Sequence, residues 1–261
     1  MIRICMLASG SKGNAIFVET AGAAILVDAG LSGKELTRRM KVIGRSPEDL
    51  DAVLISHEHS DHVRGAGVLS RGCGTAVHIT GRTFNRASSM VGKLRCVKEF
   101  EPGSPFTIND CTIYPYEVTH DAVEPVNFVI QTEGVKIGIA TDLGYASTLV
   151  KENLKSCHAL VLETNHDPVM LEQGPYPWPI KQRVKSKRGH LSNEQGAKLL
   201  EDIYHRDLEH VCLAHISETN NLAEYALKAV RSVLGGKTNG FTLHAASQHK
   251  VSPVMTVKGR R

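Results

Sequence analysis

Short runs of apolar residues recur along the chain, and each is followed by a polar stretch. Runs of this length, rich in Val, Ile and Leu, are typical of buried β-strands. They predict strands at residues 2–7, 15–19, 24–27, 52–55, 75–80, 106–114, 125–132, 135–140, 159–162, 211–214 and 241–245. Because helical patterns separate several of these strands, the chain is predicted to have an α/β (α+β) fold.

The helical patterns have recognisable starts and ends. Residues 33–43 place Leu36, Met40 and Ile43 on one face, and residues 218–234 form a longer amphipathic pattern that Gly235 stops. Further helices are expected at residues 46–50, 63–69, from residue 83 and at residues 192–204. In the last of these, Ser192 opens a capping box.

Several of the predicted strands end in a side chain that can bind a metal ion. These strand-end residues are Asp28, His57, His120, Asp142, Glu163 and His215. Side chains at strand ends of a layered fold converge on one edge of the sheets. A lone His120 or His215 is more often structural, but the recurrence favours one shared site. Asp28 is equally well explained as a turn residue or as a support behind the ligands.

The densest cluster follows the apolar run at residues 52–55 and reads Ser-His-Glu-His-Ser-Asp-His. His57 and His59 lie two apart in an extended segment, so both project to one side and can reach one ion. Asp61 and His62 follow where the chain turns, and they can face a second ion. Imidazole and carboxylate suit zinc, manganese or iron(II). A solvated polar loop is the alternative, and the pattern favours metal binding over it.

Composition narrows the class of protein. The 261 residues are 41% hydrophobic and 22% charged, with a net charge of +4, which permits a nucleic-acid partner without requiring one. The six cysteines form no Cys-x-x-Cys pair, so we expect reduced thiols. With no signal peptide, membrane span or linker visible, we expect a single cytoplasmic domain over residues 1–261, with a frayed end at residues 258–261.

Two further segments bear on ligands. The loop at residues 10–13 lacks Gly-Lys-Ser/Thr and feeds a strand, so we interpret it as a tight turn and not a phosphate loop. A basic run has no acidic residue within it and consists of Lys181, Arg183, Lys185, Lys187 and Arg188. It suits phosphates, or it is a solvated loop. Nearby Trp178 is interpreted as a packing aromatic, with base stacking as the weaker alternative.

The ordered set His57-x-His59-x-Asp61-His62, His120, Asp142 and His215 resembles the metallo-β-lactamase superfamily. Three more segments, at residues 9–14, 163–167 and 188–193, resemble its WalJ/YycJ branch. The resemblance implies a four-layer αββα sandwich with a two-metal site at one edge. It also implies exonuclease activity on DNA or RNA, because that branch is linked with such activity.

The resemblance assigns roles to these residues. It implies one ion held by His57, His59 and His120, a second held by Asp61, His62 and His215, and Asp142 bridging them, with Asp28 in support. Asp61 and His190 are the expected catalytic residues, and His190 would face the substrate phosphate from outside the metal shell. Tentative substrate-binding residues are Asn165, His166, Lys187, Arg188 and Ser192. Asp142 stands where thiol-ligated β-lactamases place Cys, which argues against antibiotic hydrolysis.

Two divalent ions, zinc or manganese, can share a water and lower its pKa toward about 7, which gives a metal-bound hydroxide. Such a centre cleaves phosphodiesters, thioesters or amides, so it does not select the substrate. We therefore predict a metal-dependent nuclease that trims DNA or RNA, possibly a 5′-to-3′ exonuclease. The alternative is a small-molecule hydrolase of a thioester or cyclic phosphodiester; a metal-binding module without catalysis is the third class considered.

Overall fold

Two seven-stranded sheets form the centre of the computed structural model, which describes residues 1–259. The first sheet contains β1 (Ile2–Ala8), β2 (Ala15–Glu19), β3 (Ala24–Val27), β4 (Ala52–Leu54), β5 (Ala76–Ile79), β6 (Val97–Glu99) and β14 (Met255–Val257). The second contains β7 (Phe106–Ile108), β8 (Cys111–Glu117), β9 (Val126–Thr132), β10 (Val135–Ala140), β11 (Ala159–Glu163), β12 (His210–Ala214) and β13 (Thr242–Ala245). Their spatial orders are β14-β1-β2-β3-β4-β5-β6 and β13-β12-β11-β10-β9-β8-β7.

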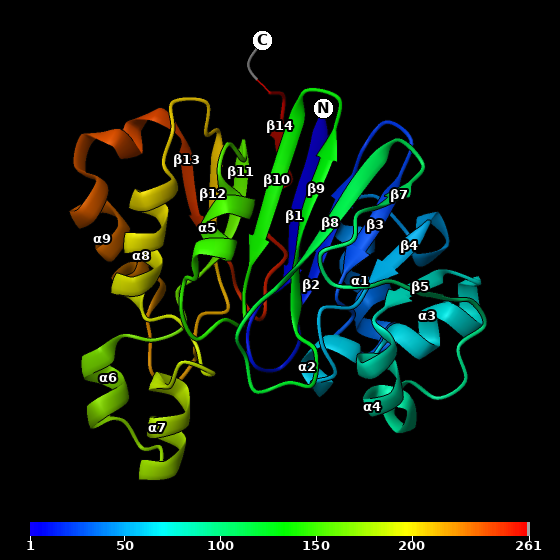
Figure 1. Ribbon diagram of the computed structural model, residues 1–261, viewed down its shortest axis with the longest axis horizontal. Coiled ribbons are helices and arrows are strands. Elements are labelled where there is room, and N and C mark those ends of the chain that lie inside the picture. Colours follow the sequence, from blue (N-terminus) through cyan, green and yellow to red (C-terminus); the bar gives the residue numbers. More distant parts are fainter. Residues whose placement is uncertain (260–261) are drawn as a thin grey trace.

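Helices lie on both outer sides of the paired sheets (Figure 1). On the side of the first sheet are α1 (Gly33–Val42), η1 (Pro47–Asp49), α2 (Ser60–Val63), α3 (Ala66–Cys73) and α4 (Gly81–Val91). On the side of the second are α5 (Thr148–Leu154), α8 (Asn193–Ile203), α9 (Ala223–Leu234) and η2 (Gly235–Gly240). Two more helices, α6 (Pro168–Gln173) and α7 (Trp178–Lys185), extend beyond one end of the sheets. The predicted αββα order is confirmed.

Strand periodicity accounts for the layers. In β1, Ile4 and Met6 point into the core between the two sheets, whereas Cys5 and Leu7 point toward the helices. In β11, Val161 joins the central core while its neighbours Leu160 and Leu162 face α8. Burying one such side chain stabilises the fold by about 1.5–3 kcal/mol. Covering both faces of each sheet, one with the other sheet and one with helices, therefore stabilises the protein.

The direction of the strands gathers the site residues. β3, β4 and β5 are parallel neighbours, and so are β10, β11, β12 and β13. β8 pairs antiparallel with β9, which pairs antiparallel with β10, so β8 also ends at the edge where β10 ends. Polar residues at these carboxyl ends therefore meet along one edge of the two sheets.

Several local predictions differ from the structure. The helix expected at residues 63–69 is two helices, because the chain breaks at Gly65, whose amide bonds the Ala29 carbonyl at 2.6 Å. A Cβ at this position would lie 2.4 Å from the Leu31 carbonyl oxygen, so the break needs glycine. The basic run lies largely in α7 and is not simply a loop, and strand β14 was not expected.

Hydrogen bonds hold the last described residues of the chain. Lys258 and Gly259 were expected to be frayed, but their amides donate to the Glu209 carboxylate at 3.0 and 2.7 Å. The rest of that predicted frayed end, residues 260–261, lies outside the described residues. Within residues 1–259, every helix is too short or too polar to cross a bilayer.

Candidate metal centre

The loop after β4 brings three imidazoles to one edge. Its extended part leads to His59, which has β-region dihedrals (φ −61°, ψ 146°) and precedes the first turn of α2. The ring centroids of His57 and His59 lie 4.6 Å apart, so the two side chains share one side as predicted. The helical turn then sends Asp61 and His62 toward a neighbouring point, where His62 is fully buried.

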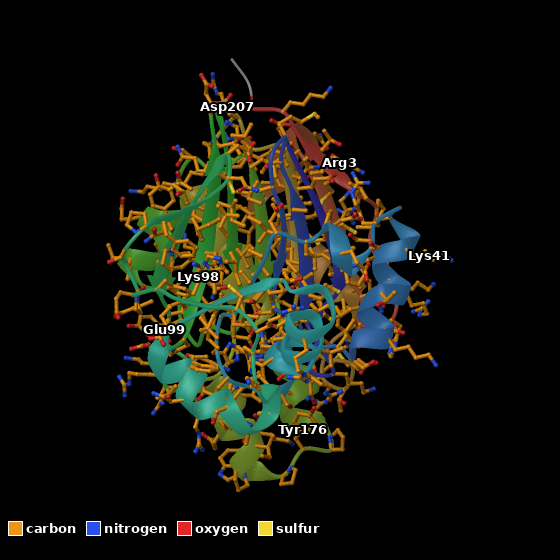
Figure 2. The ribbon with its side chains drawn as sticks, turned by 90° about the vertical axis from the view of Figure 1, so that its right-hand side faces the viewer. Arg3, Lys41, Lys98, Glu99, Tyr176 and Asp207 are labelled. Atoms are coloured by element: carbon orange, nitrogen blue, oxygen red, sulfur yellow. The ribbon has the colours of Figure 1, made fainter. Side chains whose placement is uncertain are left out.

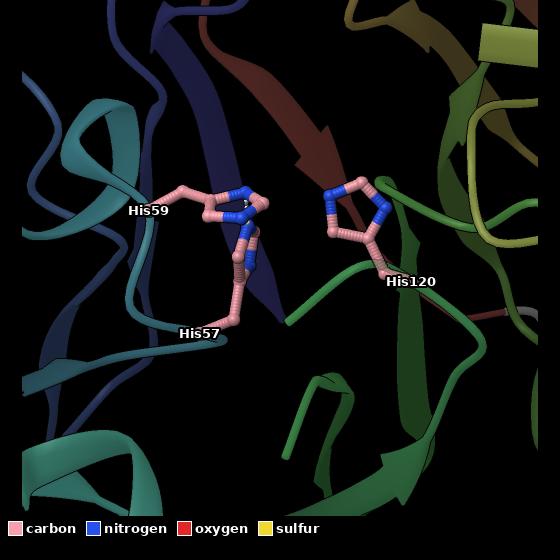
Figure 3. Close-up of side chains that lie close together, drawn as sticks. All are labelled: His57, His59 and His120. Atoms are coloured by element: carbon pink, nitrogen blue, oxygen red, sulfur yellow. Dashed lines mark hydrogen bonds between the residues drawn. The ribbon is translucent and has the colours of Figure 1, made fainter. Parts of the chain in front are cut away.

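His57, His59 and His120 form the first donor group (Figure 3). His57 Nε2 and His59 Nδ1 are 3.1 Å apart, and the His120 ring centroid is 5.1 Å from each of theirs. The outer nitrogens of two rings have partners: His57 Nδ1 meets Ser56 Oγ at 2.9 Å, and His120 Nδ1 donates to the Gly189 carbonyl at 3.2 Å. Burial lowers the pKa of both His57 and His120, which favours the neutral, metal-binding imidazole.

Asp61, His62 and His215 form the second donor group. Asp61 Oδ2 lies 3.5 Å from His62 Nε2 and 3.9 Å from His215 Nε2. Asp28 Oδ2 accepts a hydrogen bond from His62 Nδ1 at 2.8 Å, which turns His62 Nε2 toward the carboxylates of Asp61 and Asp142. Asp28 therefore supports the ligand loop.

Asp142 lies between the two groups. Its Oδ2 is 3.4 Å from His62 Nε2, and its Oδ1 is 3.5 Å from His215 Nε2 and 3.9 Å from His120 Nε2. Asp142 Oδ2 and His215 Nε2 are buried and have no hydrogen-bond partner within residues 1–259. An unpaired buried polar atom is costly, so this arrangement fits divalent cations between the two groups.

The backbone is strained at three of these positions. Asp28, Asp142 and His215 have φ values of 60°, 54° and 54°, in the left-handed region that residues other than glycine seldom adopt. Each directly follows or lies near the end of a strand, at the edge of the sheets that carries the two donor groups. Such conformations persist where the surrounding structure holds them for function.

The crowded carboxylates control the charge of the second group. Burial lowers the pKa of His215, but the charges of Asp142 and Asp61 outweigh it and raise that pKa to about 10. Burial also lowers the pKa of His62. The negative charges of Asp28, Asp142 and Asp61 outweigh burial and raise the His62 pKa well above 6.5. Without cations, protons therefore partly compensate the carboxylates in this group.

Glu163 holds two histidines in place, a role that the sequence left undetermined. It is wholly buried, and its Oε1 accepts from His190 Nδ1 at 2.8 Å and from His215 Nδ1 at 3.1 Å. Its Oε2 accepts from the amides of Leu143 and Leu191, each at 3.1 Å. Because Glu163 takes the Nδ1 protons, the Nε2 atoms of both histidines are free for other contacts.

The glycine-containing turn before β2 supports Asp61. Asn14 Nδ2 lies 3.3 Å from Asp61 Oδ2 and 3.0 Å from His62 Nε2, and the Asn14 amide bonds the Asp61 carbonyl at 2.8 Å. Gly10 N donates to Asn14 Oδ1 at 2.9 Å, and this hydrogen bond fixes the orientation of the Asn14 side-chain amide. The turn was predicted, but its contact with the metal loop was not.

A cavity of about 340 Å³ opens over both donor groups. Side chains from α7 and the preceding loop form one wall, namely Tyr176, Ile180, Arg183 and Val184. Small polar side chains line other parts of the cavity, namely Ser11, Ser60, Asn165, Ser217 and Asn220. The cavity also exposes Asp61 and His190, the two expected catalytic residues.

The tentative substrate-binding residues occupy different places. Asn165 lines the cavity, and its amide donates to the His215 carbonyl at 2.8 Å. His166 is buried away from the cavity wall, and Ser192 caps α8 by accepting from the Gln195 amide, as the capping box predicted. Lys187 and Arg188 are exposed beyond the cavity wall, and Arg188 Nε donates to the His120 carbonyl at 3.3 Å.

Two of the five cations in the basic run form ion pairs with residues outside it. Arg183 pairs with Asp121 at 2.5 Å, and Lys185 pairs with Glu172. Trp178, expected to pack, is instead 62% exposed. It belongs to the loop and helix that contain Tyr176, which lies at the end of the molecule opposite Arg3 and Asp207 (Figure 2).

The fold and this edge cluster define a metal-dependent hydrolase of the β-lactamase superfamily, and residues 23–216 match the β-lactamase superfamily domain. The chain belongs to that superfamily. It is 37% identical to the exodeoxyribonuclease YycJ of Bacillus anthracis over 260 residues, covering 98% of each chain. It is 40% identical to the exodeoxyribonuclease WalJ of Streptococcus pneumoniae serotype 2 (strain D39) over 225 residues, 85% of this chain and 84% of that one. 

The fold also matches the crystal structure of the metallo-β-lactamase fold protein YhfI from Bacillus subtilis. The TM-score is 0.73 at 15% identity, and the match covers 96% of this chain and 98% of that one. At this identity the match supports the fold alone. The superfamily implies divalent metal ions, and the two donor groups suit them.

Proposed function

We propose that this protein is a metal-dependent exonuclease that shortens DNA or RNA from an end. The observation that carries the proposal is the convergence of seven imidazole and carboxylate side chains beneath an open cavity. Two relatives that carry the exodeoxyribonuclease name match most of the chain, which supports a nucleic-acid substrate. We further propose that the chain acts as one domain, since side chains from both sheets complete the site. A cytoplasmic location is part of the same proposal and follows from the proposed nucleic-acid substrate.

The proposed centre holds two divalent ions, zinc or manganese. His57, His59 and His120 would hold one, Asp61, His62 and His215 the other, and Asp142 would contact both. When bound, the ions supply the Lewis acidity that activates water and neutralises charge on a phosphodiester.

The protein's own groups would then orient the reaction. Asp61 faces the cavity from the second donor group, where its carboxylate can accept a proton from an attacking water as well as hold an ion. His190 also lines the cavity, and with its Nδ1 proton donated to Glu163, its Nε2 can serve the leaving oxygen as a proton donor when protonated. The two residues thus divide base and acid roles.

Substrate recognition is proposed for the projecting helices and for the loop that follows α7. Lys187 is exposed, and its side chain has no ion-pair partner within residues 1–259, so it is free to contact a phosphate. Trp178 is exposed on the same projection and can stack on a base. Asn165 reaches the cavity directly, while Arg188 remains near its rim.

The test uses purified protein with manganese or zinc and DNA or RNA labelled at one end or the other. We expect metal-dependent, stepwise shortening, and the label that is released first gives the polarity. Asp61→Ala should abolish cleavage. Asp207→Asn removes an exposed carboxylate at the opposite end of the molecule and should leave the rate unchanged (Figure 2). Turnover of a small thioester or cyclic phosphodiester, without cleavage of any nucleic acid, would refute the nuclease proposal.

A further inference from the structure

A stretch of 37 residues that follows Asp61 carries positive charge only. Residues 62–98 contain seven Lys and Arg but no Asp or Glu, although 27 of the 261 residues of the chain are acidic. All seven cations are exposed, namely Arg64, Arg71, Arg82, Arg86, Lys93, Arg95 and Lys98. Within residues 1–259, only Arg82 among them forms an ion pair, with Glu124 at 3.8 Å. The segment therefore presents positive charge that the protein itself largely leaves unneutralised.

The first of these cations lies close to the cavity over the donor groups. Ser60 and Asp61 line that cavity, and the Arg64 amide donates to the Ser60 carbonyl at 3.3 Å, one helical turn further along the chain. The helix that contains Ser60, α2, packs against α4. Arg82 and Arg86 lie four residues apart in α4, so they share one face of that helix. Positive charge thus continues from the cavity along α2 and α4.

Contacts with two loops fix the position of α4 relative to the donor groups. Arg82 Nη1, at the start of α4, lies 3.8 Å from Glu124 Oε1 in the loop that carries His120. In the same loop, the Val123 amide donates to Glu58 Oε1 at 2.9 Å. Since Glu58 stands between His57 and His59, these contacts join the start of α4 to the loops that carry the first donor group.

Three more cations surround the other end of α4. Arg71, Lys93 and Arg95 line a cavity of about 190 Å³ together with Leu94. Arg71 Nη1 donates to the carbonyls of Val91 and Lys93, each at 2.9 Å, and these bonds hold the guanidinium at the end of the helix. Arg and Lys side chains around a cavity supply the charged donors that bind phosphate oxygens. Cations therefore accompany α4 from its first residues to its end.

We propose that these cations form a binding surface for the nucleic acid that extends beyond the cleaved end. The α2–α4 surface consists of Arg64, Arg71, Arg82, Arg86, Lys93 and Arg95. Figure 1 shows α4 at the same end of the molecule as α6 and α7, on the other side of the edge that carries the donor groups. A surface with exposed cations and no carboxylate of its own favours a polyanion, and a strand whose end occupies the cavity supplies one.

The inference rests on the proposed function, since it assumes a nucleic-acid substrate, and it adds where the rest of that substrate lies. Lys187 and Trp178 contact the substrate on the α7 side of the cavity in the proposed function, whereas the α2–α4 surface lies on the opposite side. Contacts on both sides would let the protein hold a strand while its end is shortened.

The experiment measures how binding depends on salt, because each phosphate contact releases counterions. Metal-loaded, full-length protein is titrated into labelled single strands and duplexes of DNA and RNA whose phosphorothioate linkages resist cleavage. The test variant combines Arg64→Gln with Arg86→Gln, since neither side chain forms an ion pair within residues 1–259. We expect lower affinity and a shallower slope of log K against log salt. Two lost contacts should reduce that slope by about 1.4 for single strands and about 1.8 for duplex DNA.

A matched control separates a local surface from net charge. Lys41→Gln combined with Arg231→Gln also removes two exposed positive charges, one from α1 and one from α9. Lys41 lies well away from α4 in Figure 2. This control should keep the wild-type slope. An equal reduction in both double variants would assign the effect to net charge and overturn the proposal, and so would an unchanged slope in the test variant.

A second variant keeps the proposal testable if Arg64→Gln disturbs α2. Arg86→Gln combined with Lys93→Gln changes only residues outside the ligand loop, and it should reduce the slope by the same amount. During cleavage of a long end-labelled strand, the KM of either test variant should rise several-fold, whereas the control should keep the wild-type KM.

The outcomes distinguish this inference from the function on which it rests. Wild type that binds none of these nucleic acids would refute the proposed function. Wild type that binds and shortens nucleic acid, with both test variants equal to it in affinity, slope and KM, would refute the α2–α4 surface alone.

Discussion

His190 Nδ1 donates to Glu163 Oε1 at 2.8 Å, and the same oxygen accepts from His215 Nδ1. One wholly buried carboxylate thus orients a proposed proton donor and a proposed metal ligand. The two functions are linked through Glu163, although the histidines follow different elements of the chain. Substitutions at Glu163 and His190 should therefore have different signatures.

Replacing Glu163 by Gln should impair both functions. The new amide would supply an NH₂ group where two histidine Nδ1 atoms now donate, which forces their protons onto Nε2. We expect loss of metal at the second donor group, lower kcat, and destabilisation of about 1–3 kcal/mol from the disrupted buried contacts. Elemental analysis and chemical denaturation would measure these effects, with Glu201→Gln at the surface as the control. Full metal content with normal kcat would contradict the role assigned to Glu163.

His190→Ala should lower the rate and leave the metal in place. General acid catalysis contributes about 10²–10⁴-fold, so we expect kcat to fall within that range. His190 approaches Asp142 at 3.7 Å between Nδ1 and Oδ1, but Glu163 takes its Nδ1 proton. Metal content from elemental analysis should equal that of wild type. Loss of an ion would instead place His190 among the ligands.

Gly30→Ala should unfold or severely destabilise the protein. A Cβ there would lie 1.6 Å from the Asp61 carbonyl oxygen, so the ligand loop would have to move. We expect a loss above about 4 kcal/mol, measured by denaturant unfolding. Gly72 in α3 is the matched control, because its added Cβ would meet no atom within 4 Å. Gly72→Ala should stabilise the protein by about 0.5–1 kcal/mol, and similar effects of the two changes would refute the steric argument.

The stability of the metal-free protein should fall as the pH rises above neutrality. The pKa of His215 is raised to about 10 from its ordinary 6.5. A raised folded-state pKa stabilises the fold fully below pH 6.5, and this contribution is lost as the pH rises toward 10. Urea unfolding at several pH values should show the decline, and His215→Gln should reduce its slope. A metal-free protein whose stability increases over this interval would contradict the assignment.

Trp178 provides a direct signal for nucleic-acid binding, because it is the chain's one tryptophan and is 62% exposed. Addition of single-stranded DNA to the metal-free protein should quench its fluorescence through stacking. Lys187→Gln should lower the affinity for DNA that this titration measures, and it should reduce the dependence of that affinity on salt. Lys237→Gln, in η2 with its ammonium over the Tyr204 ring, is the control and should leave the affinity for DNA unchanged. No quenching at concentrations that support cleavage would exclude Trp178 from the binding surface.

Much of the fold could be predicted because strands carry a strong local signal. The run at residues 52–55 is apolar and short. The histidines that follow it, His57 and His59, are two residues apart, so both side chains project to the same side of an extended segment. The recurrence of His120, Asp142 and His215 after other strands predicted a shared edge, and the structure brings these residues together. Helix breaks were less predictable, since Gly65 interrupts the helix through its contact with Ala29, remote in sequence.

Charge and contact between distant segments could not be predicted from local pattern. Arg183 belonged to a run without acidic residues, yet its partner Asp121 lies 62 positions earlier. Glu163 ended a predicted strand, but its link to His190 depends on the packing of β11 against the turn before α8. Trp178 seemed suited to packing because aromatic side chains usually bury their area, but the short helix α7 leaves it exposed.

The two outermost strands in chain order, β1 and β14, are neighbours, and Val257 is paired with Ile2. They meet at the end of the sheets away from α6 and α7 (Figure 1). A short peptide joining them would make the polypeptide a ring, and new ends could be opened in an exposed turn elsewhere. The order of the proposed metal-binding residues along the chain could thus be permuted, because their convergence depends on where the strands end in space.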